Sequence, residues 1–429
     1  MNHLKFIFPA GFYWGSATSA HQVEGGDVND WTEWERANSA RLTAEAIRRH
    51  ANAFARTPDF ILKNYPNPLQ KENYISGRAC DHYNRYEQDF DIAKSLGHNA
   101  HRFSIEWSRV EPKQGKFNEA EIEHYRKVIL ALKKRGIEPF VALWHWPIPL
   151  WLRDEGGWQC KKIPDYFSRY TQKISTVLGK DVRFWITLNE PEIYTSNSYL
   201  AGAWPPQKRN LFAYLNVLHN LIKSHRKAYE VIKKINPNAK IGISKNNIYF
   251  EACQNKIANR LLKKFIDWWW NFYFLNRIKN YQDFIGLNHY FHNRIKGFRF
   301  NQNENKTVSD MGWELYPEAI YFVLKDLKKY NKPIYITENG LADAQDKNRG
   351  WFIKETLKNV ARTIQEGVDI RGYFYWSLLD NFEWDKGFWP RFGLAEIDYS
   401  AKGGKTLERK IRPSAYEYKK IIEDSAIEA

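Results

Sequence analysis

Residues 184–191 read FWITLNEP and residues 333–340 read PIYITENG. In each stretch a run of apolar and β-branched residues ends in a glutamate, Glu190 or Glu338, and a chain-breaking residue follows within two positions. Runs of this composition and length, bounded by Pro, Asn or Gly, are typical of buried strands. The pattern therefore predicts two strands of the same kind, each with a carboxyl group at its C-terminal end.

Six other stretches follow the same apolar pattern and alternate with longer amphipathic stretches. The predicted strands are residues 12–19, 100–107, 137–146, 184–189, 240–244, 284–290, 333–338 and 372–377, and the clearest predicted helices are 119–135, 212–235 and 355–366. Eight strands, each followed by a helix, predict an α/β protein with a (β/α)8 TIM barrel. A doubly wound open sheet is the alternative, but it usually has fewer strands and an early Gly-rich phosphate turn, which this sequence lacks.

The length of 429 residues is compatible with a single barrel domain, residues 1–429, that has elaborated βα loops. Residues 27–81 form a long interruption after the first predicted strand, with a helical piece at 44–55. We interpret it as an insertion in the first βα loop, which either walls the pocket or is a structural flap. Residues 294–310, rich in Asn and Lys, predict an exposed loop.

The chain is strongly basic, with 65 Lys and Arg against 49 Asp and Glu, a formal charge of +16. Such a balance raises nucleic acid or an anionic membrane surface as partners, provided that the charge is clustered. The basic residues are instead spread over predicted helices, which is typical of solvated helix faces. No apolar run approaches the roughly 20 residues of a spanning helix. We therefore expect neither a nucleic-acid nor a membrane partner.

The cysteines indicate the compartment. Cys80, Cys160 and Cys253 lie far apart and form no Cys-x-x-Cys pair, which fits a reducing environment. We expect a cytoplasmic protein.

Glu190 and Glu338 suggest a reaction. Hydrolysis of a glycosidic bond needs two carboxyl groups, one on each side of the bond. In a barrel, both should lie at C-terminal strand ends. One such glutamate is better explained by an ion pair or a helix cap, but two at equivalent positions on the fourth and seventh predicted strands favour catalysis.

Further motifs occur in order from the first predicted strand to the last. They are FP at 8–9, WG at 14–15, ATSAHQVEG at 17–25, RFSIEWSR at 102–109, TLNEP at 187–191, ITENG at 336–340 and GYFYWSLLDNFEW at 372–384. In these motifs the sequence resembles glycoside hydrolase family 1, the β-glucosidase family, over nearly the whole chain. The resemblance implies a retaining β-glycosidase that removes terminal β-D-glucosyl residues, and also β-D-galactosyl residues, from small β-glucosides or oligosaccharides. It implies no metal and no cofactor, and it leaves the oligomeric state open.

The resemblance also implies residue roles. Glu190 would be the acid/base, protonated at rest, and Glu338 the ionised nucleophile that forms a covalent glycosyl-enzyme intermediate. The implied substrate-binding residues are Gln22, His145, Trp146, Asn189, Tyr290, Trp376, Glu383 and Trp384, with Arg102 and Asn288 in support. Structural explanations stay open for three of them: a helix cap for Asn189, a core position for His145 and a salt bridge for Arg102.

Two departures and two alternatives qualify this interpretation. The chain has His289 where many members have Tyr, and Pro147 where they have Asp. A 6-phospho-β-glycosidase usually has Ser, Lys and Tyr after the last strand, whereas this chain has Glu383 and Trp384 there, and the carboxylate would repel phosphate. A non-catalytic sugar-binding relative would have lost one carboxylate, and both are present.

Overall fold

A closed barrel of eight parallel strands forms the centre of the computed structural model, which describes residues 5–52, 57–400 and 406–428. In barrel order the strands are β10 (Ile334–Asn339), β11 (Ile370–Trp376), β2 (Tyr13–Ala17), β3 (Ala100–Ser104), β4 (Glu138–Ala142), β5 (Phe184–Asn189), β6 (Lys240–Asn246) and β8 (Ile285–Asn288). Each predicted strand corresponds to one of them. The predicted (β/α)8 barrel is confirmed.

Aromatic side chains fill the interior of the barrel. The rings of Phe140 and Phe184 stack with centroids 4.1 Å apart, and Tyr335 packs on both at 5.3 and 5.6 Å. Glycines make room for these rings: a Cβ on Gly242 would lie 2.7 Å from the ring of Phe284. The interior is therefore a packed core, and the open space lies at the strand ends.

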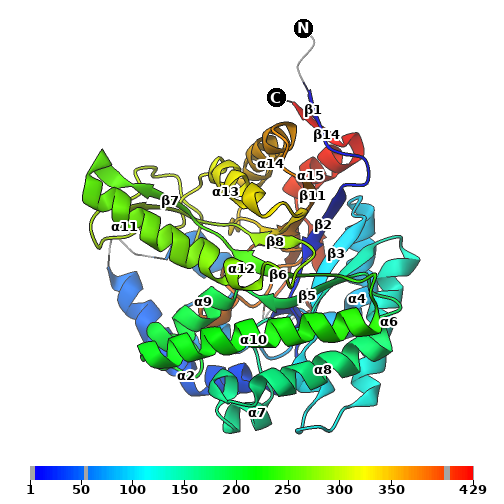
Figure 1. Cartoon of the computed structure of the whole chain (residues 1–429). Coiled ribbons are helices and arrows are strands. Elements are labelled where there is room, and N and C mark those ends of the chain that lie inside the picture. Colours follow the sequence, from blue (N-terminus) through cyan, green and yellow to red (C-terminus); the bar gives the residue numbers. More distant parts are fainter. Residues whose placement is uncertain (1–4, 53–56, 401–405, 429) are drawn as a thin grey trace.

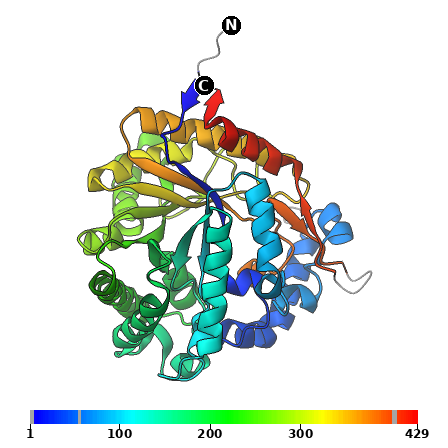
Figure 2. The ribbon, with the colours of Figure 1, turned by 90° about the vertical axis from the view of Figure 1, so that its right-hand side faces the viewer.

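Helices surround the barrel (Figures 1 and 2). They include α4 (His82–Ser95), α6 (Glu119–Lys134), α8 (Ile163–Leu178), α10 (Leu211–Ile235), α12 (Tyr273–Ile278), α13 (Ala319–Leu327), α14 (Arg349–Gln365) and α15 (Pro413–Asp424), with the shorter α5 (Trp107–Val110), α7 (Leu150–Asp154) and α9 (Pro191–Thr195). None of the helices within the described residues has the length and apolar character needed to cross a bilayer.

The helix predicted at 355–366 begins six residues earlier, at Arg349. The sequence pattern missed this start because Gly350 lies in the first turn. The carboxylate of Asp343 accepts hydrogen bonds from the backbone N–H groups of Asn348 and Arg349, at 2.6 and 3.1 Å. It satisfies the free donors at the helix start from outside the local sequence.

The segment 27–81 lies between α1 (Ala20–Val23) and α4, and contains α2 (Asp30–Ala51), α3 (Asp59–Asn64) and the short turn η1 (Lys71–Tyr74). The helical piece predicted at 44–55 is the second half of α2, and its residues 53–55 lie outside the described residues. The helix starts earlier because Asn29 and Thr32 form a reciprocal capping box.

Among the described residues, short strands form three pairs outside the barrel. β7 (Tyr249–Ala252) pairs with β9 (His292–Ile295), β1 (Lys5–Ile7) with β14 (Ala426–Glu428), and β12 (Ala395–Ile397) with β13 (Arg409–Ile411). The exposed loop predicted at 294–310 is thus wrong at its start, where Arg294 and Ile295 belong to β9. The alternation of this short strand was too brief to recognise.

Candidate active site

A cavity of about 320 Å³ opens at the C-terminal ends of the barrel strands. This volume is near the lower end of the range for small-molecule sites. Ten of the predicted site residues line it: Gln22, His145, Trp146, Asn189, Glu190, Tyr290, Glu338, Trp376, Glu383 and Trp384. Arg102 and Asn288 lie directly behind and contact these residues. The structure thus brings all twelve together.

Glu338 lies on β10 and is only 4% exposed. The guanidinium of Arg102, from β3, donates to its Oε1, and the hydroxyl of Tyr290 donates to its Oε2 at 2.8 Å. Arg102 is fully buried. One carboxylate oxygen therefore faces a fixed cation and the other a neutral donor.

Glu190 follows β5 and has a different environment. Its Oε1 accepts hydrogen bonds from two amides, Asn288 at 2.9 Å and Asn246 at 3.1 Å. Burial, followed by the negative charge of Glu338, raises the pKa of Glu190 to about 8. At neutral pH this carboxyl group is therefore protonated and able to donate.

The backbone of Glu190 is also unusual. Its φ of 42° lies in the left-handed region, and its N–H donates to the carbonyl of Ser244 on β6 at 2.8 Å. Such a conformation costs of order 1–3 kcal/mol and persists only where surrounding structure holds it. Pro191 begins α9 immediately afterwards. The turn from strand to helix therefore fixes the direction of this side chain.

Asn189 connects the two glutamates. Its Oδ1 accepts from Arg102 at 2.6 Å and from Asn288 at 3.1 Å, and its Nδ2 lies 3.0 Å from Nε2 of His145. The side chain makes these contacts instead of capping α9. Burial keeps the pKa of His145 well below its usual value, so the ring is neutral and can accept from the amide.

Gln22 and Glu383 lie at the outer end of the cavity and are hydrogen-bonded to each other. The amide of Gln22 donates to the carbonyl of Phe382 at 2.9 Å and to the carboxyl of Glu383 at 3.2 Å, and Ser19 donates to its Oε1 at 2.7 Å. Burial and the charge of Glu338 raise the pKa of Glu383 to about 8. These groups can accept and donate side by side, as neighbouring hydroxyls require.

Aromatic rings form the walls. The ring of His145 lies nearly parallel to those of Trp376 and Trp384, with centroids 6.0 and 5.9 Å away. Trp146 packs against Trp384 at 4.5 Å, and its indole N–H donates to the carbonyl of Asn189 at 3.1 Å. Flat rings beside polar groups suit the apolar face of a sugar.

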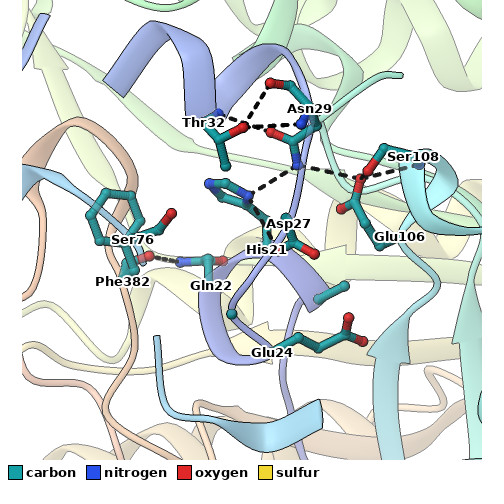
Figure 3. A network of polar contacts seen from close by, with 12 residues as sticks. His21, Gln22, Glu24, Asp27, Asn29, Thr32, Ser76, Glu106, Ser108 and Phe382 are labelled. Atoms are coloured by element: carbon teal, nitrogen blue, oxygen red, sulfur yellow. Dashed lines mark hydrogen bonds and ion pairs between the residues drawn. The ribbon is translucent and has the colours of Figure 1, made fainter. Parts of the chain in front are cut away.

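A buried polar network surrounds His21, the residue that precedes Gln22 (Figure 3). The imidazole of His21 lies 2.7 Å from the carboxylate of Glu35 and 3.6 Å from that of Asp27. Burial alone would lower the pKa of His21, but the two carboxylates raise it to about 10. The resulting imidazolium stacks on Trp384, with centroids 5.6 Å apart and planes 13° from parallel.

The segment 27–81 acts through this network. Among the described residues, 27–52 and 57–81 do not line the cavity. Instead Trp31 packs on Trp384 at 4.7 Å, and Glu35 accepts hydrogen bonds from the backbone N–H and the hydroxyl of Ser76. The described part of the segment therefore packs against Trp384 in the wall of the cavity but does not line the cavity itself.

Sequence reasoning missed several cavity residues. Asn246 was missed because the strand predicted at 240–244 continues to residue 246. Trp204, which donates to Asp385 at 3.0 Å, and Trp313 come from loops without a recognised pattern. The departure at His289 is structural: its Nδ1 lies 2.9 Å from the carbonyl of Asn247, and burial lowers its pKa to about 4.

Within the described ranges, no group of three or more His, Cys, Asp or Glu side chains is arranged to hold a metal ion. The polar groups of the cavity instead match the hydroxyls of a sugar.

Two buried carboxyl groups at strand ends, in one aromatic-walled cavity of a (β/α)8 barrel, define the glycoside hydrolase class of enzyme. The chain belongs to that class through one family, "Glycosyl hydrolase family 1", which it matches over residues 4–276 and 255–427. It is 34% identical to Beta-glucosidase A of Thermotoga maritima, over 98% of this chain and 99% of that protein. It is 32% identical to Beta-glucosidase 42 of Arabidopsis thaliana, over 97% and 94%.

Solved structures agree. A β-glycosidase from Pyrococcus horikoshii superposes with a TM-score of 0.85 at 35% identity, over 99% of this chain and 97% of that chain. The β-glucosidase from Thermotoga maritima in complex with glucoimidazole gives 0.83 at 31% identity, over 98% and 99%.

Proposed function

We propose that the protein is a retaining β-glucosidase that removes terminal β-D-glucosyl residues, and also β-D-galactosyl residues, from small glycosides and oligosaccharides. One observation carries the proposal: two buried carboxyl groups in one cavity have opposite surroundings. Glu338 faces the cation of Arg102, whereas Glu190 accepts from two neutral amides and has a pKa raised to about 8. The relatives named β-glucosidases support the same activity.

In the first step Glu338 would attack the anomeric carbon, forming a glycosyl ester while the bond to the leaving oxygen breaks. Glu190 would give its proton to that oxygen, so the aglycone leaves as an alcohol. In the second step the carboxylate of Glu190 would take a proton from water. The water oxygen would attack the anomeric carbon and release Glu338. The anomeric configuration is retained after two inversions.

The polar contacts support this division of roles. Asn189 would bind the 2-hydroxyl, with Arg102 and Asn288 holding its oxygen, and His145 would complete that side. Gln22 and Glu383 would clasp the outer hydroxyls. Trp146, Trp376 and Trp384 would stack on the sugar, and Tyr290 would hold Glu338.

A 6-phospho-β-glycosidase is disfavoured. The carboxyl group of Glu383 lines the cavity, where burial raises its pKa and the acidic side chains of Glu338 and Asp385 lie close enough to raise it further. A phosphate there would meet these acidic groups, and Lys386, which lines the cavity beside them, is already paired with Asp385 at 2.6 Å. We also propose that the chain is one catalytic domain, since a single hydrophobic cluster contains residues from Phe8 to Ile427.

A cytoplasmic location is also part of the proposal. Cys80, Cys160 and Cys253, all described, carry free thiols. Free thiols are usual where the environment is reducing.

The test is hydrolysis of aryl β-D-glucoside and β-D-galactoside by the wild type and by Glu338→Ala with added azide. An active wild type, and rescue of the variant with an α-glycosyl azide as product, would establish both the retaining mechanism and the nucleophile. Glu190→Ala, the matched variant at the other carboxyl group, should give the β-glycosyl azide instead. A wild type that cleaves neither glycoside would contradict the proposal, and phosphorylated glycosides would then be tried first.

A further inference from the structure

Helix α11 (Ile257–Asp267) and the π-helical segment η5 (Trp268–Phe272) that continues it carry an apolar stripe on their outer surface. Ile257, Leu261, Phe265 and Trp268 are 70, 62, 59 and 45% exposed. Their spacing of four, four and three residues puts them on one face of the helix. Large apolar side chains gathered in this way on an exposed surface usually mark a site of interaction.

Basic residues surround the stripe. The segment 256–268 has four basic residues and one acidic residue, Asp267, which pairs with Lys263 at 2.9 Å. Lys256, Arg260 and Lys264 are exposed. An apolar face with Trp and Phe, bordered by Lys and Arg, is typical of a helix that lies in a lipid interface.

The turn after β9 has the same composition. Residues 296–300 read KGFRF, and Phe298 is 90% exposed. The N–H of Gly297 donates to Oδ1 of Asn259, on α11, at 2.9 Å. This hydrogen bond fixes the turn beside the first turn of the helix, so that two elements distant in sequence form one surface.

The surface lies at the edge of the molecule, where α11 is seen at the left of Figure 1. Both elements belong to connections that follow C-terminal ends of barrel strands, β6 for α11 and β8 for the turn. Asn246, the last residue of β6, donates to Glu190. The surface is therefore on the same side of the barrel as the active site.

We propose that α11 and the turn 296–300 bind the surface of an anionic lipid bilayer. The apolar stripe would enter the headgroup region, and the flanking cations would meet lipid phosphates. Charge decides against a second copy of the chain as the occupant, because two basic surfaces of a protein with a formal charge of +16 repel each other. The proposal goes beyond the glycosidase reaction and does not depend on it.

The experiment is co-sedimentation of the full chain with vesicles of phosphatidylcholine alone, or of equal parts phosphatidylcholine and phosphatidylglycerol. The wild type should sediment with the anionic vesicles only, and less at high salt. The double variant Leu261→Ser/Phe265→Ser should lower the partition coefficient by about tenfold or more.

Matched single variants test the site. Trp268→Ser removes a tryptophan that is 45% exposed, and Trp351→Ser removes one on α14 that is 46% exposed. The first should weaken binding by several-fold, and the second should leave it unchanged. All variants should keep wild-type hydrolysis of aryl glucoside, because none of these residues lines the cavity.

Three results would overturn the proposal. The wild type could fail to sediment with either vesicle. The α11 variants could bind like the wild type, which would indicate general adsorption of a basic protein. Sedimentation velocity without lipid could show self-association that the double variant abolishes, which would identify a second copy as the occupant.

Discussion

The ends of β5 and β10 present the same side chain in two different environments. Glu338 faces the buried guanidinium of Arg102 and the hydroxyl of Tyr290. Glu190 accepts from the amides of Asn246 and Asn288, which carry no charge. The two glutamates therefore differ in the charge of their hydrogen-bond partners, a guanidinium beside Glu338 and neutral amides beside Glu190.

A neutral side chain, that of Asn189, connects the different surroundings of the two glutamates. Asn189 accepts from both Arg102 and Asn288, so the groups that hold the two glutamates are themselves joined. A change at one glutamate is therefore expected to reach the other through these side chains. Breaking the comparison therefore means changing one carboxyl group at a time and asking whether the other still behaves as before.

The largest effect is expected from Glu338→Gln. It removes the proposed nucleophile but keeps the size of the side chain, and kcat for aryl β-glucoside should fall by about 10⁴-fold or more. Steady-state kinetics would measure this. Glu138→Gln is the matched control, because Glu138 begins β4 at the opposite end of the barrel; it should leave kcat within about twofold of the wild type. Equal losses in both variants would contradict the assignment.

Glu190→Gln should separate substrates by leaving group. Dinitrophenolate departs from its glucoside without needing a proton, so the rate of the first step with this substrate should change by less than about tenfold. An alkoxide needs the proton, so the rate with an alkyl glucoside should fall by about 10³-fold.

For the alkyl glucoside, wild-type kcat/KM should fall as the pH rises through about 8, where Glu190 loses its proton. This limb should vanish in the variant. Equal losses with both substrates would refute the role of acid.

The same substitution should alter stability in a pH-dependent manner. Burial raises the pKa of Glu190 from 4.5 to about 8, so the folded state binds this proton more tightly than the unfolded state. The unfolding free energy of the wild type should therefore fall as the pH rises from about 4.5 to about 8. Glu190→Gln removes that loss, and Tm should rise by about 2–4 °C at about pH 9 but not at about pH 4. Differential scanning calorimetry at both values would show a pH-independent shift if the interpretation is wrong.

The sequence alone could predict the barrel, because its strands are apolar runs that end in breakers, and glutamates at two of those ends pointed to one face. It could not predict Asn246. The residue before it, Lys245, is fully buried and lies 3.3 Å from the carboxylate of Glu192. A lysine normally marks the end of a buried strand, but its ammonium pairs with Glu192 and donates to the carbonyl of Asn246 at 2.6 Å, so that β6 continues to the residue that contacts Glu190.

The start of α14 and the surface of α11 were missed for related reasons. Asp343 caps α14 from outside the helix, so local propensity gives no sign of it. The expectation of no membrane partner was drawn from spread charge and the absence of a long apolar run. Neither criterion detects a short helix that would lie in a lipid interface, because its apolar residues are separated by basic ones.

The smallest effect concerns His21, which supports the aromatic wall without reaching the carboxyl pair. His21→Gln removes an imidazolium held by Glu35 and stacked on Trp384, so KM for aryl glucoside should rise about three- to tenfold while kcat stays within about twofold. Because Glu35 and Asp27 raise the pKa of His21 to about 10, its stabilisation is complete below about 6.5 and is lost as the pH rises to about 10. The wild type should therefore lose stability over that window and the variant should lose less. If kcat fell as much as KM rose, His21 would act on the reacting groups, and the separation between wall and carboxyl pair would not hold.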